Sequence, residues 1–384
     1  MTIQNQALSL KNNKHCSPPF ALPDRDDPRK PPSVSEWASS HPLEHKVHKN
    51  RCFESPLAHH PFSSGAAPEE KAVCYCPMVK AAVKRESACP TASGMPLVGM
   101  FDSGIGGFSV LRAWRGQLPG VPVLYVADQA HVPYGGRPRE ELYRLAAGIT
   151  RFLLGRGARL VTVACNTASG AALHRLRAEF PGTPFVGMEP AVKPAAAATR
   201  SGVVGVLATP GTLTGELYAG VVQRFAHGQS LLEDACPGLV ARIEAGDLDG
   251  PGTRAILERA LRPMLARGMD ALVLGCTHYP LVLPLIRELA GPGVEILDPA
   301  PAVARRAAWV LTEAGLLPAA PATATARAPL FLATTGDPDI LAAQAARLLP
   351  GETPELLAIR WEADMLISFL PRQRSAASAC SGRS

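Results

Sequence analysis

From residue 97 onward, short apolar runs alternate with amphipathic stretches, and this alternation constrains the fold more than any other feature of the sequence. Between the runs, apolar residues recur at helical spacing, most clearly over 140–154 and 168–180. Because strands covered on both faces of a sheet are apolar along their whole length, the pattern predicts an α/β fold with buried parallel sheets. Strands are expected at residues 97–102, 123–128, 160–165, 185–189, 203–209, 271–276, 295–298 and 330–334.

Two parts of the chain repeat the same order of elements. In the first, a strand ends at Asp102, a glycine-rich turn follows at 104–107, and a later strand ends at Cys165. In the second, one strand ends at Thr209 and a later one at Cys276. The spacings are 63 residues (165 − 102) and 67 residues (276 − 209). We therefore expect two similar parallel-sheet α/β domains that face each other, with the active site between them.

Basic residues divide the chain near residue 95. Eight of the nine lysines precede it and only Lys193 follows, whereas only four arginines precede it. The first segment shows no period of 2 or 3.6, which predicts either a disordered extension or a wrongly assigned start ahead of Met95. The expected parts are an extension (1–95), a first domain (96–191 with about 300–371), a second domain (192–299) and a disordered tail (372–384).

Composition excludes several classes of protein. The formal charge of +6 is mild for 384 residues and predicts no nucleic-acid partner. The longest apolar runs, such as 202–208, are far shorter than the roughly 20 residues of a membrane span. The first fifteen residues lack the apolar centre of a secretory signal, so a cytoplasmic location is expected. Histidines and cysteines gather before residue 95, but their spacing matches no standard zinc pattern, and no metal site is predicted.

Two cysteines at predicted strand ends indicate which type of reaction the site could catalyse. In open parallel sheets, ligands bind beyond the carboxyl ends of the strands, where Cys165 and Cys276 are expected. A following helix N-terminus favours the thiolate over the thiol. Inverting a carbon centre by proton transfer needs a base on one face and an acid on the other, with the roles exchanged in reverse. One thiol on each side of a ligand meets this need, although two ordinary buried cysteines remain the alternative.

Removal of the α-proton of an amino acid also needs fixed hydrogen-bond donors, because negative charge develops beside the carboxylate. Asn166, Thr167 and Thr277, next to the two cysteines, are the candidate donors. Pyridoxal phosphate would require a Schiff-base lysine, and beyond residue 95 only Lys193 is present. The sequence therefore favours an amino-acid racemase that uses no cofactor.

Five motifs together resemble those of bacterial glutamate racemases. Their order and spacing fit that family over roughly residues 97 to 370. Gln129-Ala130-His131 departs from the family pattern, and Gly170 stands where alanine is usual. The motifs are Val98-Gly99-Met100-Phe101-Asp102-Ser103-Gly104-Ile105-Gly106-Gly107, Pro133-Tyr134-Gly135, Ala164-Cys165-Asn166-Thr167-Ala168-Ser169, Cys236-Pro237 with Glu244, and Gly275-Cys276-Thr277-His278-Tyr279-Pro280.

The resemblance implies interconversion of L- and D-glutamate without a cofactor, D-glutamate then serving peptidoglycan synthesis. It implies that Cys165 takes the α-proton of D-glutamate and Cys276 that of L-glutamate. Asp102 and His278 would assist the two thiols, with Glu244 as a further acidic residue near the second. The resemblance also implies a homodimer, since enzymes of this type often form dimers and twofold pairing is the commonest arrangement. The implied substrate-binding positions are Asp102, Ser103, Tyr134, Gly135, Asn166, Thr167, Thr277 and His278.

Simpler roles stay open for several of these residues. Asp102 could cap the following turn, His278 could be a satisfied histidine at a helix start, Tyr134 could serve turn chemistry, and Glu244 could lie on a solvated helix face.

Three rival functions remain. A dinucleotide-binding dehydrogenase is suggested by Gly104-x-Gly106 and Asp128, but Ser109 replaces the third glycine and neither cysteine has a task. A racemase of aspartate or another small acid would use the same thiols. A binding protein that kept the fold without catalysis is the third.

Overall fold

The computed structural model describes residues 95–317 and 327–369, which all lie in one compact unit of the chain. The disorder predicted for 1–95 and 372–384 lies outside the described residues, apart from Met95 itself. So do the histidines and cysteines considered as metal ligands. Within the described part of the chain, no helix is long and apolar enough to cross a membrane.

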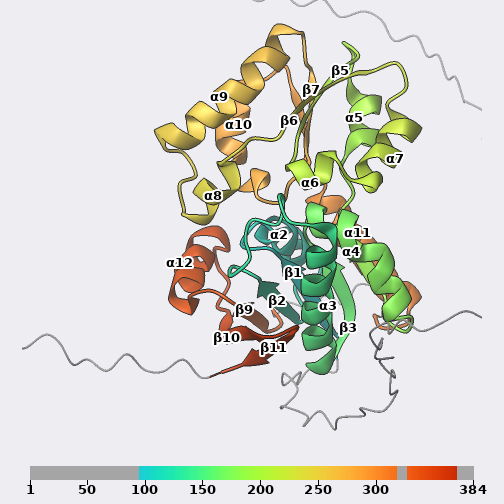
Figure 1. Cartoon of the computed structure of the whole chain (residues 1–384), viewed down its shortest axis with the longest axis vertical. Coiled ribbons are helices and arrows are strands. Elements are labelled where there is room, and N and C mark those ends of the chain that lie inside the picture. Colours follow the sequence, from blue (N-terminus) through green and yellow to red (C-terminus); the bar gives the residue numbers. More distant parts are fainter. Residues whose placement is uncertain (1–94, 318–326, 370–384) are drawn as a thin grey trace, which may run out of the picture. The chain divides into compact units, whose positions relative to one another are not determined.

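The larger sheet has seven strands in the order β11-β10-β9-β2-β1-β3-β4 (Figure 1). Neighbouring strands are parallel except for β10 and β11, which form an antiparallel pair at one edge. Its strands are β1 (Leu97–Asp102), β2 (Val123–Ala127), β3 (Ala158–Val163), β4 (Phe185–Gly187), β9 (Leu330–Thr334), β10 (Glu355–Glu362) and β11 (Met365–Ser368). The helices that go with it are α2 (Phe108–Gln117), α3 (Arg139–Gly155), α4 (Asn166–Glu179), α11 (Ala300–Glu313) and α12 (Pro338–Leu348).

The smaller sheet has four parallel strands in the order β6-β5-β7-β8. Its strands are β5 (Val203–Leu207), β6 (Ser230–Asp234), β7 (Ala271–Leu274) and β8 (Glu295–Leu297). The accompanying helices are α5 (Val192–Ala198), α6 (Pro210–Leu213), α7 (Glu216–Phe225), α8 (Leu239–Glu244), α9 (Pro251–Ala266), the 3₁₀ helix η1 (Tyr279–Val282) and α10 (Leu283–Ala290).

The two sheets share one topology, which is the internal repeat predicted from the sequence. In the first, β1 lies between β2 and β3, and β4 lies beyond β3. In the second, β5 lies between β6 and β7, and β8 lies beyond β7. The cysteine-bearing strands β3 and β7 therefore hold equivalent positions, and the expected α/β class with two parallel-sheet units is confirmed.

Burial explains why the central strands were visible in the sequence. Every residue of β1, β2, β7 and β9 is buried, and apart from Asp102 and Thr334 at two strand ends the residues are apolar or glycine. Helix α3 packs against α4 and the strands β1 and β3, and it buries one face that includes Leu142, Ile149 and Leu153. On the same helix Gly148 permits close packing, since a Cβ there would lie 2.6 Å from the ring of Trp361.

All eight predicted strands are present, but several end earlier than expected. β3 ends at Val163 and β7 at Leu274, so each cysteine follows its strand by two residues instead of ending it. Three strands were missed. β6 is only partly buried, and β10 and β11 form an edge hairpin whose exposed residues interrupt the apolar pattern.

Candidate active site

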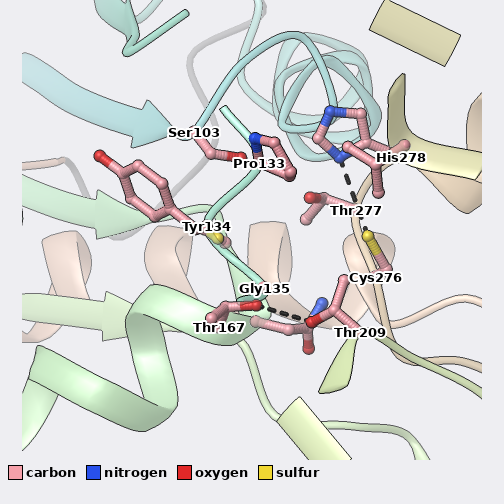
Figure 2. A pocket seen from close by; sticks show the side chains of 12 residues that line it. Ser103, Pro133, Tyr134, Gly135, Thr167, Thr209, Cys276, Thr277 and His278 are labelled. Carbon is pink, nitrogen blue, oxygen red and sulfur yellow. Dashed lines mark hydrogen bonds between the residues drawn. The ribbon is translucent and has the colours of Figure 1, made fainter. Parts of the chain in front are cut away.

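One cavity lies beyond the carboxyl ends of β3 and β7 and is lined by both cysteines. Figure 2 shows the cavity with Cys276 labelled. Its free volume is about 10 Å³, which is close to the space of one water molecule. The lining residues are Ser103, Pro133, Tyr134, Gly135, Cys165, Asn166, Thr167, Thr209, Val240, Cys276, Thr277 and His278. Apart from Asp102 and Glu244, which lie behind it, every residue predicted for the site lines this cavity.

Cys165 is the N-cap of α4, and its Sγ accepts a hydrogen bond from Ala168 N at 3.5 Å. The thiol is 5% exposed. Burial first, and then the nearby charge of Asp102, raises the pKa of Cys165 well above its usual value, although the bond from Ala168 opposes this. The sequence-based expectation that the helix would lower this pKa is therefore wrong, because desolvation outweighs one backbone donor.

Asp102, at the end of β1, is fully buried beside Cys165. Its Oδ2 accepts hydrogen bonds from Gly107 N at 2.6 Å and from Thr277 Oγ1 at 3.1 Å, and Ser103 Oγ donates to Oδ1 at 3.4 Å. Burial raises the pKa of Asp102, opposed by the charge of His278 and by the bond to Cys165. A carboxylate with a raised pKa holds a proton more readily than an exposed one.

Cys276 precedes the short 3₁₀ helix η1 and not an α-helix, which corrects the second half of the expectation about helix dipoles. The partner of this thiol is an imidazole, since Cys276 Sγ lies 3.8 Å from His278 Nδ1. On the other side of the ring, His278 Nε2 lies 2.6 Å from Glu244 Oε1. The three side chains form a line from thiol through imidazole to carboxylate.

The charges along this line reinforce one another. Burial alone lowers the pKa of His278, but its contacts with Cys276 and Glu244 raise it well above its ordinary value. Burial likewise raises the pKa of Glu244, yet the hydrogen bond and charge of His278 bring it below the usual range. The geometry therefore favours an imidazolium paired with the Glu244 carboxylate and in contact with the Cys276 thiol group. Glu244 is 10% exposed, so the solvated helix face considered from the sequence is wrong.

The glycine-rich turn after β1 lies against these side chains. A Cβ at Gly106 would lie 2.7 Å from Thr277 Oγ1, and one at Gly107 would lie 2.6 Å from the hydroxyl of Tyr125. A Cβ at Gly104 would meet the carboxylate of Glu244. The turn thus needs glycine because of Glu244 and His278, whereas a dinucleotide fingerprint needs it to approach a pyrophosphate. This contact argues against the dehydrogenase hypothesis.

Polar groups of the cavity offer unused hydrogen-bonding capacity. Asn166 is 4% exposed, and neither its Nδ2 nor its Oδ1 has a partner among the described residues. Buried amides are normally paired, so this side chain is suited to a polar ligand. Thr167 Oγ1 lies 2.8 Å from Thr209 Oγ1 and 3.4 Å from Thr212 Oγ1.

Tyr134 contributes differently from what the sequence suggested. Its ring points away from Cys276 and His278 (Figure 2), and its hydroxyl donates to Asp128 Oδ2 at 2.7 Å. The adjacent Gly135 O accepts from Gly211 N at 2.8 Å. Because the Tyr134 hydroxyl is bonded to Asp128 and Gly135 has no side chain, we expect this turn to contact a ligand through its backbone.

Sequence reasoning missed three lining residues, Pro133, Thr209 and Val240. Thr209 follows β5, the counterpart of β1 in the second sheet, so the internal repeat could have identified it by its equivalence with the Asp102-Ser103 end of β1. No signal in the sequence singled out Val240.

Comparisons with known proteins agree on one family. A profile of the Asp/Glu/Hydantoin racemase family matches residues 109–307. The chain is 53% identical over 267 residues to the glutamate racemase of Roseiflexus sp. (strain RS-1), covering 69% of this chain and 97% of that relative. It is 49% identical over 264 residues to the glutamate racemase of Pseudomonas aeruginosa (strain PAO1), with 69% and 93% covered.

Solved structures give the same result. The Escherichia coli glutamate racemase in complex with L-glutamate and the activator UDP-MurNAc-ala matches with a TM-score of 0.60 and 32% identity, covering 69% of this chain and 97% of that one. The Thermus thermophilus glutamate racemase in complex with β-chloro-D-alanine matches with a TM-score of 0.58 and 37% identity, covering 71% and 98%.

Proposed function

The chain belongs to the Asp/Glu/Hydantoin racemase family and, within it, to the glutamate racemases, and on that premise we propose that it interconverts L- and D-glutamate by a two-thiol mechanism. One observation carries this proposal: a single cavity is lined by two cysteines, each of which follows one of two topologically equivalent strands. Each thiol also has its own proton-handling neighbour, Asp102 for Cys165 and His278 for Cys276.

In the L-to-D direction, Cys276 as a thiolate removes the α-proton and Cys165 as a thiol delivers its own proton to the opposite face. Cys276 ends as a thiol and Cys165 as a thiolate, so the reverse reaction starts from the state that the forward reaction leaves. The imidazolium of His278 stabilises the Cys276 thiolate, and Glu244 stabilises the imidazolium.

On the other side, Asp102 serves as the base for Cys165. Burial keeps this thiol protonated, so its proton must be taken up by a nearby group before it can attack D-glutamate. The raised pKa of Asp102 suits it to that task.

The substrate is held by polar groups that line the cavity. The Asn166 amide, which has no partner among the described residues, offers a donor for a carboxylate. Thr167 and Thr277 can contribute when their hydroxyls turn from their present partners, together with backbone groups of Ser103 and of the Tyr134-Gly135 turn. Such fixed donors stabilise the charge that develops when the α-proton leaves. A free volume of about 10 Å³ is too small for glutamate, so we expect the lining elements to move apart when the substrate enters.

The biological setting follows from the same premise. We place the enzyme in the cytoplasm as a homodimer that supplies D-glutamate for peptidoglycan synthesis. We assign residues 96–191 with about 300–371 to one domain and 192–299 to the other.

The test is a circular dichroism assay on the purified full chain, given L-glutamate or L-aspartate separately with no added cofactor. We expect the glutamate signal to decay to zero, since the two enantiomers are equally stable. A faster loss of signal with aspartate would refute the choice of substrate, and no loss with either would refute racemisation.

A further inference from the structure

Glu244 is held from two sides, although the mechanism above uses only one. Its Oε1 receives His278 Nε2 at 2.6 Å and Ile105 N at 2.8 Å. Its Oε2 has a different partner, Gln129 Nε2, at 3.2 Å. Gln129 directly follows Asp128 after β2, in the segment where the sequence departs from the family pattern.

The orientation of the Gln129 amide is set by a chain of donors. Gly336 N donates to Thr334 Oγ1 at 2.8 Å, which leaves the hydroxyl proton free to bond Gln129 Oε1, also at 2.8 Å. The Nε2 end must then face Glu244, whose carboxylate can only accept.

A second glutamine completes this arrangement. Gln129 Nε2 also lies 3.1 Å from Gln344 Oε1, on α12. Gln344 Nε2 in turn donates to the backbone O of Glu244 at 2.6 Å. The last residue of α8 is thus fixed by its side chain and its main chain at once, by residues of the larger sheet and its helix.

We propose that Gln129 is a positioning residue for the reaction: its amide holds the Glu244 carboxylate against His278 and so sets the charge of the imidazole that faces Cys276. This role rests on the proposed function, because it acts through the same thiol. The residue touches neither the thiol nor the cavity, so its effect passes entirely through Glu244.

The charged surroundings fix the direction of the effect. Burial raises the pKa of Glu244, and the contacts with His278, with Ile105 N and then with Gln129 lower it. His278 is faced by Cys276, by Glu244 and, from β1, by Asp102, and Glu244 is also near the phenol of Tyr125. Without the donor at Oε2, the pKa of Glu244 rises and its carboxylate is less stable. The carboxylate then stabilises the His278 imidazolium less, so the pKa of His278 falls.

The experiment replaces Gln129 with leucine and measures two properties of the full-length protein. The first is the titration of His278, followed by NMR on ¹³C-labelled histidine, with the signal identified by its loss in His278→Gln. The second is the pH profile of kcat/KM for glutamate. Gln117→Leu is the matched control, because Gln117 is exposed at the end of α2 and, among the described residues, its amide donates to Pro301 O alone.

We expect Gln129→Leu to move the His278 titration and the basic limb of the profile to lower pH together. We expect kcat/KM to fall about 5- to 10-fold near neutral pH, a loss within the usual range for one hydrogen bond. Gln129→Asn, which keeps the amide but is one methylene shorter, should shift both in the same direction by less. Gln117→Leu should shift neither.

A purely structural role predicts something else. Gln129→Leu or Gln129→Asn would then lower the melting temperature and leave both the titration and the profile where they are in the wild type, which overturns the proposal. The NMR titration needs no turnover. A wild-type protein that fails to racemise glutamate would therefore reveal failure of the proposed function separately.

Discussion

Replacing Asp102 with asparagine should separate catalysis from stability. The structure shows how an amide fits the site: its oxygen can take the place of Oδ2, which accepts from Gly107 N and Thr277 Oγ1. Its NH₂ group then replaces Oδ1, whose partner is the hydroxyl of Ser103, a group that can also accept. These three hydrogen bonds survive in the variant, whereas the charge and the ability to take up the Cys165 proton are lost.

The effect on activity combines two opposing contributions. Removing the carboxylate charge takes away one cause of the raised pKa of Cys165, but burial, the larger cause, is unchanged. The base that accepts the thiol proton disappears, and general base assistance contributes roughly 10²- to 10⁴-fold to a rate. We therefore expect kcat from D-glutamate to fall about 100-fold, equivalent to about 2.7 kcal/mol of barrier.

The effect on stability has the opposite sign. Because the pKa of Asp102 is raised in the folded protein, its contribution to stability is fully present below the unfolded value of 3.8 and is lost as pH rises through the folded value. Asp102→Asn should thus melt at the same temperature or higher than wild type, with a difference that grows as pH rises.

The assay pairs circular dichroism kinetics with thermal unfolding between about pH 4 and pH 8, a range that spans the onset of the titration. Asp337→Asn is the control, because this exposed residue caps α12 and asparagine caps equally well. A kcat within threefold of wild type would refute the role of Asp102 as a base. A lower melting temperature at neutral pH would refute the argument from its raised pKa.

Two further predictions come from close contacts around the site. Gly106→Ala should abolish most activity and destabilise the fold by about 1–3 kcal/mol, because its Cβ would lie 2.7 Å from Thr277 Oγ1 and from His278 Cε1; Gly116→Ala, with open space around it on α2, should be neutral or stabilising in the same melting assay. Asp128→Asn should raise KM more than it lowers kcat and cost about 1–3 kcal/mol of stability, since the carboxylate receives Tyr134 Oη, Thr335 Oγ1 and Trp361 Nε1 at 2.7–2.8 Å. An unchanged KM with full stability would contradict the latter.

The sequence predicted the central elements well because burial there is uniform. β1 and β9 have the bounds expected from their apolar runs, and β3 and β7 differ from expectation only at their ends. The edge strand β6 carries no such signal, since none of its residues is fully buried and its five residues include a serine and two acids. The two halves of the internal repeat share few residue types, but four strands of each sheet have the same order.

The cysteines were identified by position, whereas their electrostatics depended on tertiary contacts. Nothing in the local sequence shows that Asp102 lies beside Cys165, or that Glu244 contacts His278 from 34 residues away. Each contact joins residues that lie far apart in the sequence but in the same half of the fold, and each changes the charge expected of a thiol or an imidazole. For the same reason Gln129 was noticed only as a departure from the family pattern.

The central claim, that one thiol acts on each face of the α-carbon, is tested most directly by running the reaction in deuterated water with wild type, Cys165→Ala and Cys276→Ala. We expect the wild-type product to carry deuterium at the α-carbon while recovered substrate carries little, and both variants to lose racemisation. Substantial racemisation by either single-cysteine variant would contradict the two-thiol mechanism.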